Sequence, residues 1–194
     1  MKLPGKSSRF AFRKKPLGNR ALIQRKLEKK KLIELVELGP AEKAVELKAF
    51  LKKPGRELHG IDRALTRGEL IHKNNSLLWL RKGRFSRVLK SYKPESVKLF
   101  RMKIVLSYQG KPEQVAKEYT PVFRQVFEKL VSGGRFQVSE KREHLEAIKP
   151  VLERIGFRVS VFRPAGKSET TSFWQTVYAR GPEKPWVLNA VKPR

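Results

Sequence analysis

Positive charge outweighs negative charge so strongly in this chain that a compact fold must keep most of its cations at the surface, near an anionic partner. The sequence holds 45 Lys and Arg against 18 Asp and Glu, a net charge of +27 over 194 residues. Self-repulsion on this scale opposes compaction. Because 39% of the residues are nevertheless hydrophobic, we expect a folded core with extensions that bind nucleic acid.

Two stretches carry the charge without any acidic residue. Residues 1–27 contain nine basic residues, and residues 70–94 contain seven. Pro4, Gly5, Pro16 and Gly18 interrupt the first stretch, which predicts a basic extended arm over residues 1–18. The same composition is typical of an organelle-targeting segment. Both alternatives place the protein inside the cell, in the cytoplasm or in an organelle such as the mitochondrion.

The segment after the arm is predicted to be helical with a basic β-hairpin, over residues 19–93. Apolar spacing suggests helices near residues 20–38, 40–52 and 60–72, ended by Gly39-Pro40 and by Pro54-Gly55. Strands near residues 77–81 and 84–90 would pair around a turn at Lys82-Gly83. The arginines and lysines of this hairpin would then face a phosphate backbone.

Residues 94–181 are predicted to form a mixed-sheet β-α-β-α-β-β unit, so the expected fold class is α+β. Strands are expected near residues 97–108, 135–139, 157–163 and 172–180, and helices near residues 115–130 and 139–155. In the first strand Phe100, Met102 and Ile104 alternate with Arg101 and Lys103, which predicts a basic outer face. Residues 182–194 read as a Pro-rich C-terminal tail.

The chemistry-bearing residue types argue against catalysis. The chain has no cysteine, which excludes disulfides, thiol chemistry and cysteine-ligated zinc. Asp62 is its one aspartate, so no Ser-His-Asp arrangement can be assembled and a two-metal site would have to be built from glutamates. His59 and Asp62 with His72 match no established metal-ligand spacing. We therefore predict no enzyme activity, no metal, no cofactor and no small-molecule substrate.

The favoured hypothesis is a structural RNA-binding component of a large ribonucleoprotein, such as a ribosomal or organellar ribosomal protein, that also contacts neighbouring proteins. RNA is favoured over DNA. The residues predicted to bind nucleic acid are Arg9, Arg13, Lys14, Lys15, Arg20, Arg25, Arg81, Lys82, Arg84, Arg87 and Lys90. Trp79, Phe85, Trp174 and Tyr178 are candidates for base stacking, although core packing is the more common role of such residues.

Three alternatives stay open at this point. A winged-helix DNA-binding protein would use the three N-terminal helices and the hairpin, with Arg63 and Arg67 on the recognition helix. A nucleic-acid-processing enzyme would need Glu69, Glu95 and a lysine in one cleft. A protein that coats anionic membranes would need a clearly amphipathic helix, and no such helix is evident.

Overall fold

The computed structural model describes residues 32–40, 45–65, 67–103, 110–164 and 185–194. The chain divides into two compact units, Met1–Lys31 and Leu32–Arg194, and everything described belongs to the second. The arm and its predicted helix up to residue 31 lie outside the described residues. So do the end of the first expected strand and the predicted strand at 172–180.

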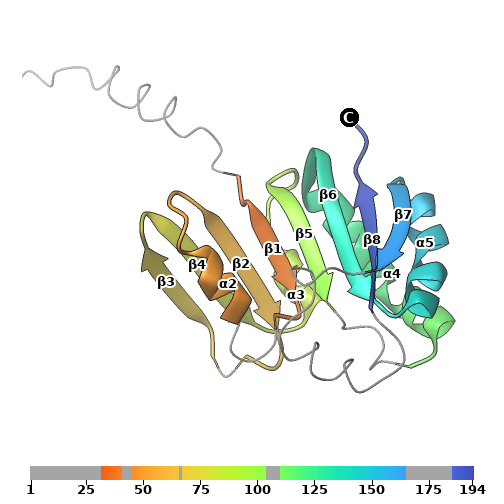
Figure 1. The fold of residues 1–194 in the computed structure, drawn as a ribbon, viewed down its shortest axis with the longest axis horizontal. Coiled ribbons are helices and arrows are strands. Elements are labelled where there is room, and N and C mark those ends of the chain that lie inside the picture. Colours follow the sequence, from red (N-terminus) through yellow and green to blue (C-terminus); the bar gives the residue numbers. More distant parts are fainter. Residues whose placement is uncertain (1–31, 41–44, 66, 104–109, 165–184) are drawn as a thin grey trace, which may run out of the picture. The chain divides into compact units, whose positions relative to one another are not determined.

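The second unit is built on one eight-stranded sheet with the order β3-β4-β2-β1-β5-β6-β8-β7 (Figure 1). The strands are β1 (Leu35–Leu38), β2 (Glu57–Asp62), β3 (Glu69–Lys73), β4 (Ser76–Lys82), β5 (Val97–Lys103), β6 (Leu130–Glu140), β7 (Arg158–Pro164) and β8 (Trp186–Val191). The five strands from β4 to β6 pair in parallel, whereas β3 and β8 run antiparallel to their neighbours.

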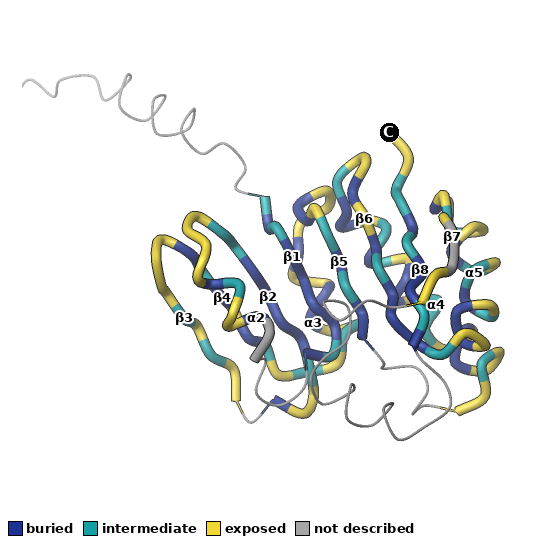
Figure 2. Tube along the Cα trace, in the orientation of Figure 1, coloured by how far each residue is buried: buried dark blue, intermediate teal, exposed yellow. Residues whose placement is uncertain are grey.

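Helices cover both faces of this sheet. The helices α3 (Phe85–Leu89), α4 (Pro112–Lys129) and α5 (Arg142–Ile155) pack on one face through a core that includes Phe100, Phe123 and Phe136. The short helix α2 (Val45–Phe50) packs on the other face with a separate leucine cluster. The arrangement is a doubly wound α/β fold, in which central parallel strands are buried on both faces; Figure 2 shows this burial along β1 and β2.

The predicted α+β class is therefore wrong, chiefly because helices were predicted over all or part of the first three strands. Residues 35–38 form β1, with all four residues buried, and residues 57–62 and 69–73 form β2 and β3. A strand buried on both faces loses its alternating pattern. The apolar spacing of Leu35, Val36 and Leu38 then resembles one face of a helix. The three-helix arrangement required by a winged helix is absent from the described residues.

The predicted hairpin is also misplaced. β4 confirms the strand at 77–81, but residues 85–89 are the helix α3. The partner of β4 is β3, which precedes it, and the two-residue turn is Asn74-Asn75, with φ values of 50° and 57°. Two consecutive positive φ angles are the signature of a type I′ turn, which asparagine tolerates.

The later elements agree with the sequence pattern. α4 and α5 are helices through Pro121 and Pro150, and Gly156 ends α5 with a φ of 114°. β5 directs Phe100 and Met102 into the core as predicted. Its other face is not a basic outer surface, because Lys103 is only 1% exposed and Arg101 lies 3.7 Å from the buried Glu37 carboxylate. The segment expected as a tail contributes β8, which pairs with β6 and β7.

Candidate functional site

The carboxyl ends of the parallel strands meet along one edge of the sheet, where α/β folds of this kind bind their ligands. Gly39 follows β1, Asp62 ends β2, Gly83 follows β4 and Lys103 ends β5. β1 pairs with β2 on one side and with β5 on the other. The strand order therefore reverses at β1, and the carboxyl ends of β1 and β5 mark the topological switch point of the sheet.

Asp62 is held in a defined orientation at this edge. Its Oδ1 accepts a hydrogen bond from the backbone N–H of Ala64 at 2.9 Å, and its backbone carbonyl accepts one from the N–H of Gly83 at 3.0 Å. The first bond is an Asx turn, which fixes the carboxylate relative to the loop that follows β2. The second ties the end of β2 to the end of β4.

A cavity of about 420 Å³ opens beside Asp62. Its size falls in the range of small-molecule sites. Residues from the ends of β2 and β4 and from the helices α3 and α4 line it: Asp62, Arg63, Ala64, Gly83, Arg84, Phe85, Ser86, Glu118, Tyr119 and Val122. It thus combines two carboxylates and two cations with two aromatic rings, the chemistry needed for a polar ligand with a flat apolar part.

Tyr119, on α4, lines this cavity with a protonated hydroxyl. Burial raises the pKa of Tyr119, and the nearby carboxylates of Glu118, Glu140 and Asp62 raise it further, while the Arg63 guanidinium lowers it. The net pKa lies above the usual value of 10.0. The phenol therefore stays neutral at physiological pH, where it can donate or accept a hydrogen bond.

The loop after β1 differs from a phosphate-binding loop. Gly39 has a φ of 80° and donates its N–H to the carbonyl of Ile61 at 2.9 Å, but it is followed by Pro40 and not by a glycine-rich run. Loops that cradle a diphosphate use further glycines to let the backbone approach the phosphates. Residues 41–44 lie outside the described residues.

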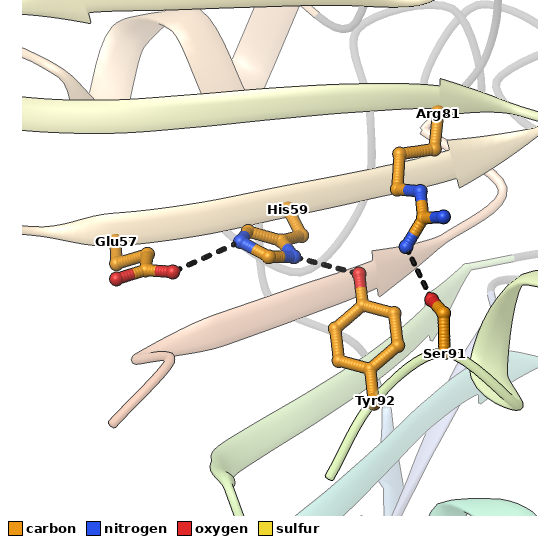
Figure 3. Close-up of polar contacts among 5 residues, drawn as sticks. All are labelled: Glu57, His59, Arg81, Ser91 and Tyr92. Carbon is orange, nitrogen blue, oxygen red and sulfur yellow. Dashed lines mark hydrogen bonds and ion pairs between the residues drawn. The ribbon is translucent and has the colours of Figure 1, made fainter. Parts of the chain in front are cut away.

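A second polar cluster lies on the α3 side of the sheet (Figure 3). The His59 Nδ1 lies 2.7 Å from the Tyr92 hydroxyl, and its Nε2 lies 3.3 Å from the Glu57 carboxylate. The Arg81 guanidinium donates a hydrogen bond to the Ser91 hydroxyl at 2.6 Å. The cluster connects β2 and β4 with the segment that follows α3, so it holds that segment against the face of the sheet.

The His59 cluster predicts a pH dependence of stability. Burial lowers the pKa of His59 below 6.5, and Glu57 only partly opposes this effect. The fold therefore favours neutral His59, so its contribution is complete above pH 6.5 and is lost as the pH falls toward the folded-state pKa. Chemical denaturation between pH 7.5 and pH 5 should show the free energy of unfolding fall more steeply for the wild type than for His59→Gln. Equal slopes would contradict this assignment.

The cations predicted for the hairpin lie along the end of β4 and on α3. Lys82, Arg84, Arg87 and Lys90 are exposed and Arg81 is half-buried. Of the predicted stacking residues, Trp79 is 42% exposed, whereas Phe85 packs partly against the core. Six other predicted cations, Arg9, Arg13, Lys14, Lys15, Arg20 and Arg25, lie outside the described residues, as do Trp174 and Tyr178.

Sequence reasoning missed the role of Asp62, which it counted only as evidence against catalysis. The available signal was the order of the segments: a short apolar run ending at Gly39, then a second run ending in an acid 23 residues later (62 − 39). An acid about 20 residues after the first glycine of a βαβ unit is typical of ribose recognition. Among the described residues, no group of three or more His, Cys, Asp or Glu could hold a metal ion.

No helix in the described part of the chain combines the length and the apolar character that crossing a membrane requires.

Several solved structures of methyltransferases share the fold of this chain. The 16S rRNA methyltransferase KamB superposes with a TM-score of 0.60 at 12% identity, over 89% of this chain and 94% of that one. A 16S rRNA (adenine(1408)-N(1))-methyltransferase from Catenulisporales acidiphilia gives 0.57 at 14% identity, over 93% and 97%. A SAM-dependent methyltransferase from Archaeoglobus fulgidus gives 0.54 at 12% identity, over 89% and 92%.

The chain thus has the Rossmann-like, mostly parallel fold of S-adenosylmethionine-dependent methyltransferases. No protein-family model and no curated protein sequence matches it.

These neighbours correct the function predicted from the sequence. They are consistently methyltransferases, a finding that contradicts the prediction of a structural ribosomal or ribonucleoprotein component without activity. Excluding a small-molecule substrate was also wrong by this comparison, since one neighbour was solved with S-adenosylhomocysteine. Both predictions failed for the same two reasons. The whole function was inferred from the positive charge, and the end of β2, which holds Asp62, was predicted to be helical.

Proposed function

We propose that this protein is an S-adenosylmethionine-dependent methyltransferase. The observation that carries the proposal is the position of Asp62. It is a carboxylate fixed at the carboxyl end of the second strand of a methyltransferase-like sheet, beside a cavity of about 420 Å³. Likeness of fold alone does not define an activity, because one fold hosts many chemistries. The proposed activity therefore requires a cavity whose residues can bind S-adenosylmethionine.

The residues of the cavity fit S-adenosylmethionine. The Asp62 carboxylate offers acceptors for the ribose hydroxyls, and charge-assisted hydrogen bonds of this kind are the stronger ones. Phe85 and Tyr119 give the cavity aromatic walls for a flat adenine ring. Bound there, the donor would supply an electrophilic methyl group on a sulfonium. The residues of the chain would bind it, orient it and keep water from it.

The same cavity suits a dinucleotide less well. Nicotinamide and flavin dinucleotides carry a diphosphate, which doubly wound folds bind on a glycine-rich loop after the first strand. Here Gly39 is followed by Pro40, so the second and third glycines of that loop are missing. S-adenosylmethionine has a ribose and no phosphate. A site with a ribose-binding carboxylate and no glycine-rich loop therefore favours the methyl donor.

Ligand titration tests this choice. In calorimetry with the full chain, S-adenosylmethionine and S-adenosylhomocysteine should bind with micromolar dissociation constants, and NAD should bind at least about 10-fold more weakly, a difference of about 1.4 kcal/mol. Tighter binding of NAD would replace the methyltransferase proposal with a dinucleotide enzyme. Absence of binding by either ligand at millimolar concentration would refute both.

Transfer itself is tested with methyl-tritiated S-adenosylmethionine. The protein should incorporate label into one of three acceptor pools, namely total RNA, genomic DNA or total protein. The Asp62→Ala variant, whose donor binding should be much weaker, serves as the control and should incorporate far less label at a donor concentration below the wild-type dissociation constant. Label incorporated equally by the wild type and by Asp62→Ala would contradict the assignment of the donor site.

A further inference from the structure

Two large apolar side chains are exposed in the described part of the chain, and they lie opposite each other on one hairpin. Leu70 is 55% exposed and Trp79 is 42% exposed. They are direct partners in the register of β3 and β4. Burying both would have been favourable, so an exposed pair at one place on a folded unit indicates a contact surface.

The Trp79 ring is held in place. The Arg81 guanidinium stacks on it with 4.7 Å between Cζ and the ring centroid, and Arg81 is itself hydrogen-bonded to Ser91. The His59 imidazole packs edge-on against the indole from below, with centroids 5.6 Å apart. The buried cluster of Figure 3 therefore supports an exposed aromatic ring. A ring that is ordered in advance loses less entropy when a partner stacks on it.

The same segment is rich in cations, and three of them are exposed on or next to α3. From residue 70 to residue 94 the sequence has seven basic residues and no acid. Arg84, Arg87 and Lys90 are exposed, and none of them has an ion pair within the described residues. On α5, by contrast, Arg142 pairs with Glu146 and Lys149 with Glu153. The charge of Arg84, Arg87 and Lys90 therefore lies on the segment that directly follows β4, the strand that carries Trp79.

This surface continues into the candidate donor cavity. Gly83 and Arg84, which connect β4 to α3, and Phe85 and Ser86, which begin α3, all line the cavity. Trp79 lies four residues before Gly83 on an extended strand, which places it roughly 13 Å away at 3.3 Å per residue. A polyanion lying on the surface would thus reach the site of methyl transfer. We call the group formed by Trp79, Arg81, Lys82, Arg84, Arg87 and Lys90 the β4–α3 surface.

We propose that the β4–α3 surface binds RNA, stacking one unpaired base on Trp79 and placing the adjoining phosphates on Arg84, Arg87 and Lys90. The cations match a polyanion, and the exposed indole selects a partner with accessible base faces, which structured RNA offers in its loops and a DNA duplex does not. That this RNA is the methyl acceptor rests on the proposed function. The binding itself does not.

Substitution of Trp79 tests the stacking. The probe is a fluorescein-labelled RNA hairpin with an unpaired loop, titrated with the full chain and followed by anisotropy without S-adenosylmethionine. Trp79→Leu keeps apolar volume but removes the π system, so it should weaken binding about 10-fold, in the range of one lost base stack. Trp79→Phe should keep most of the affinity. Equal affinity of Trp79→Leu and the wild type would overturn the stacking proposal.

A charge-matched pair of triple variants tests the phosphate contacts. The first triple variant combines Arg84→Ala, Arg87→Ala and Lys90→Ala. Its plot of log affinity against log salt should be less steep by about 2, since each contact with single-stranded RNA contributes about 0.7 to the slope. The control removes three exposed cations on α4 and α5, Lys117, Arg124 and Arg154, and should change the slope much less. Equal effects of the two triples would overturn the assignment of this surface.

Competition identifies the partner class and separates the two proposals. Unlabelled loop RNA should displace the probe more effectively than duplex DNA or anionic vesicles of equal charge; preference for either of these would overturn RNA binding. Calorimetry of Trp79→Leu with S-adenosylmethionine should match the wild type. Trp79-dependent RNA binding by a protein that binds no methyl donor would support this inference and refute the proposed function. If the protein binds the methyl donor but its RNA affinity does not depend on Trp79, the result would support the proposed function and refute this inference.

Discussion

Asp62→Ala is expected to weaken S-adenosylmethionine binding on the order of 100-fold, the largest effect of any single substitution on ligand affinity in this protein. The carboxylate lines the cavity at the end of β2 and is oriented by the N–H of Ala64. Removing a charged acceptor of two ribose hydroxyls costs about 3 kcal/mol, since hydrogen bonds to charged groups contribute about 1.5–3 kcal/mol each. Calorimetric titration of the wild type and the variant measures the difference directly.

Two controls make this result specific. Asp62→Asn keeps an oxygen acceptor for the Ala64 N–H but removes the charge, so it should show a smaller loss, about 10-fold. Glu69→Ala removes a half-buried acid whose carboxylate pairs with the solvent-accessible Lys48 at 3.4 Å, and such pairs contribute little. It should bind the donor like the wild type. If Asp62→Ala also bound like the wild type, the donor would lie elsewhere.

Phe136→Ala is expected to give the largest loss of stability. Phe136 is fully buried on β6, with ring centroids 5.9 Å from Phe123 of α4 and 6.0 Å from Phe157. Truncating a buried phenylalanine costs about 3–5 kcal/mol through lost transfer energy and the cavity left behind. For a chain of this size the melting temperature should fall by about 10 °C.

The matched control for this prediction is Leu70→Ala. Leu70 is 55% exposed, so its truncation should change the free energy of unfolding by no more than about 0.5 kcal/mol. Urea unfolding followed by circular dichroism measures both variants. A loss below about 1 kcal/mol for Phe136→Ala would contradict the placement of this part of β6 in the buried core, between β5 and β8.

The part of the fold that sequence patterns could predict was the part with one exposed face. α4 and α5 show clear helical spacing, because one side of each packs on the sheet and the other is solvated. Gly156 marked the end of α5 through its positive φ. β1 and β2 could not be recognised by alternation, since both of their faces are covered. Gly60 in β2 even reads as a helix breaker or turn, although it allows Leu47 and Leu80 to pack closely.

The candidate site was harder to predict than the fold, because its residues come from separate strand ends. Asp62 and Gly83 approach each other only through the parallel pairing of β2 with β4. Tyr119 joins them from α4, more than 50 residues after Asp62. Without the strand order nothing in the sequence connects these positions. The basic segment at 81–90 could be identified from composition alone, but its hairpin was assigned to the wrong turn, because Asn74-Asn75 was overlooked in favour of Lys82-Gly83.

A crystal structure of the chain in complex with S-adenosylhomocysteine would decide whether Asp62 marks the donor site. We expect the ribose hydroxyls within hydrogen-bond distance of the Asp62 carboxylate, and the adenine in the cavity between Phe85 and Tyr119. A ligand bound away from the carboxyl ends of β1, β2 and β4, or a crystal soaked at millimolar concentration with no ligand at this edge, would contradict this expectation.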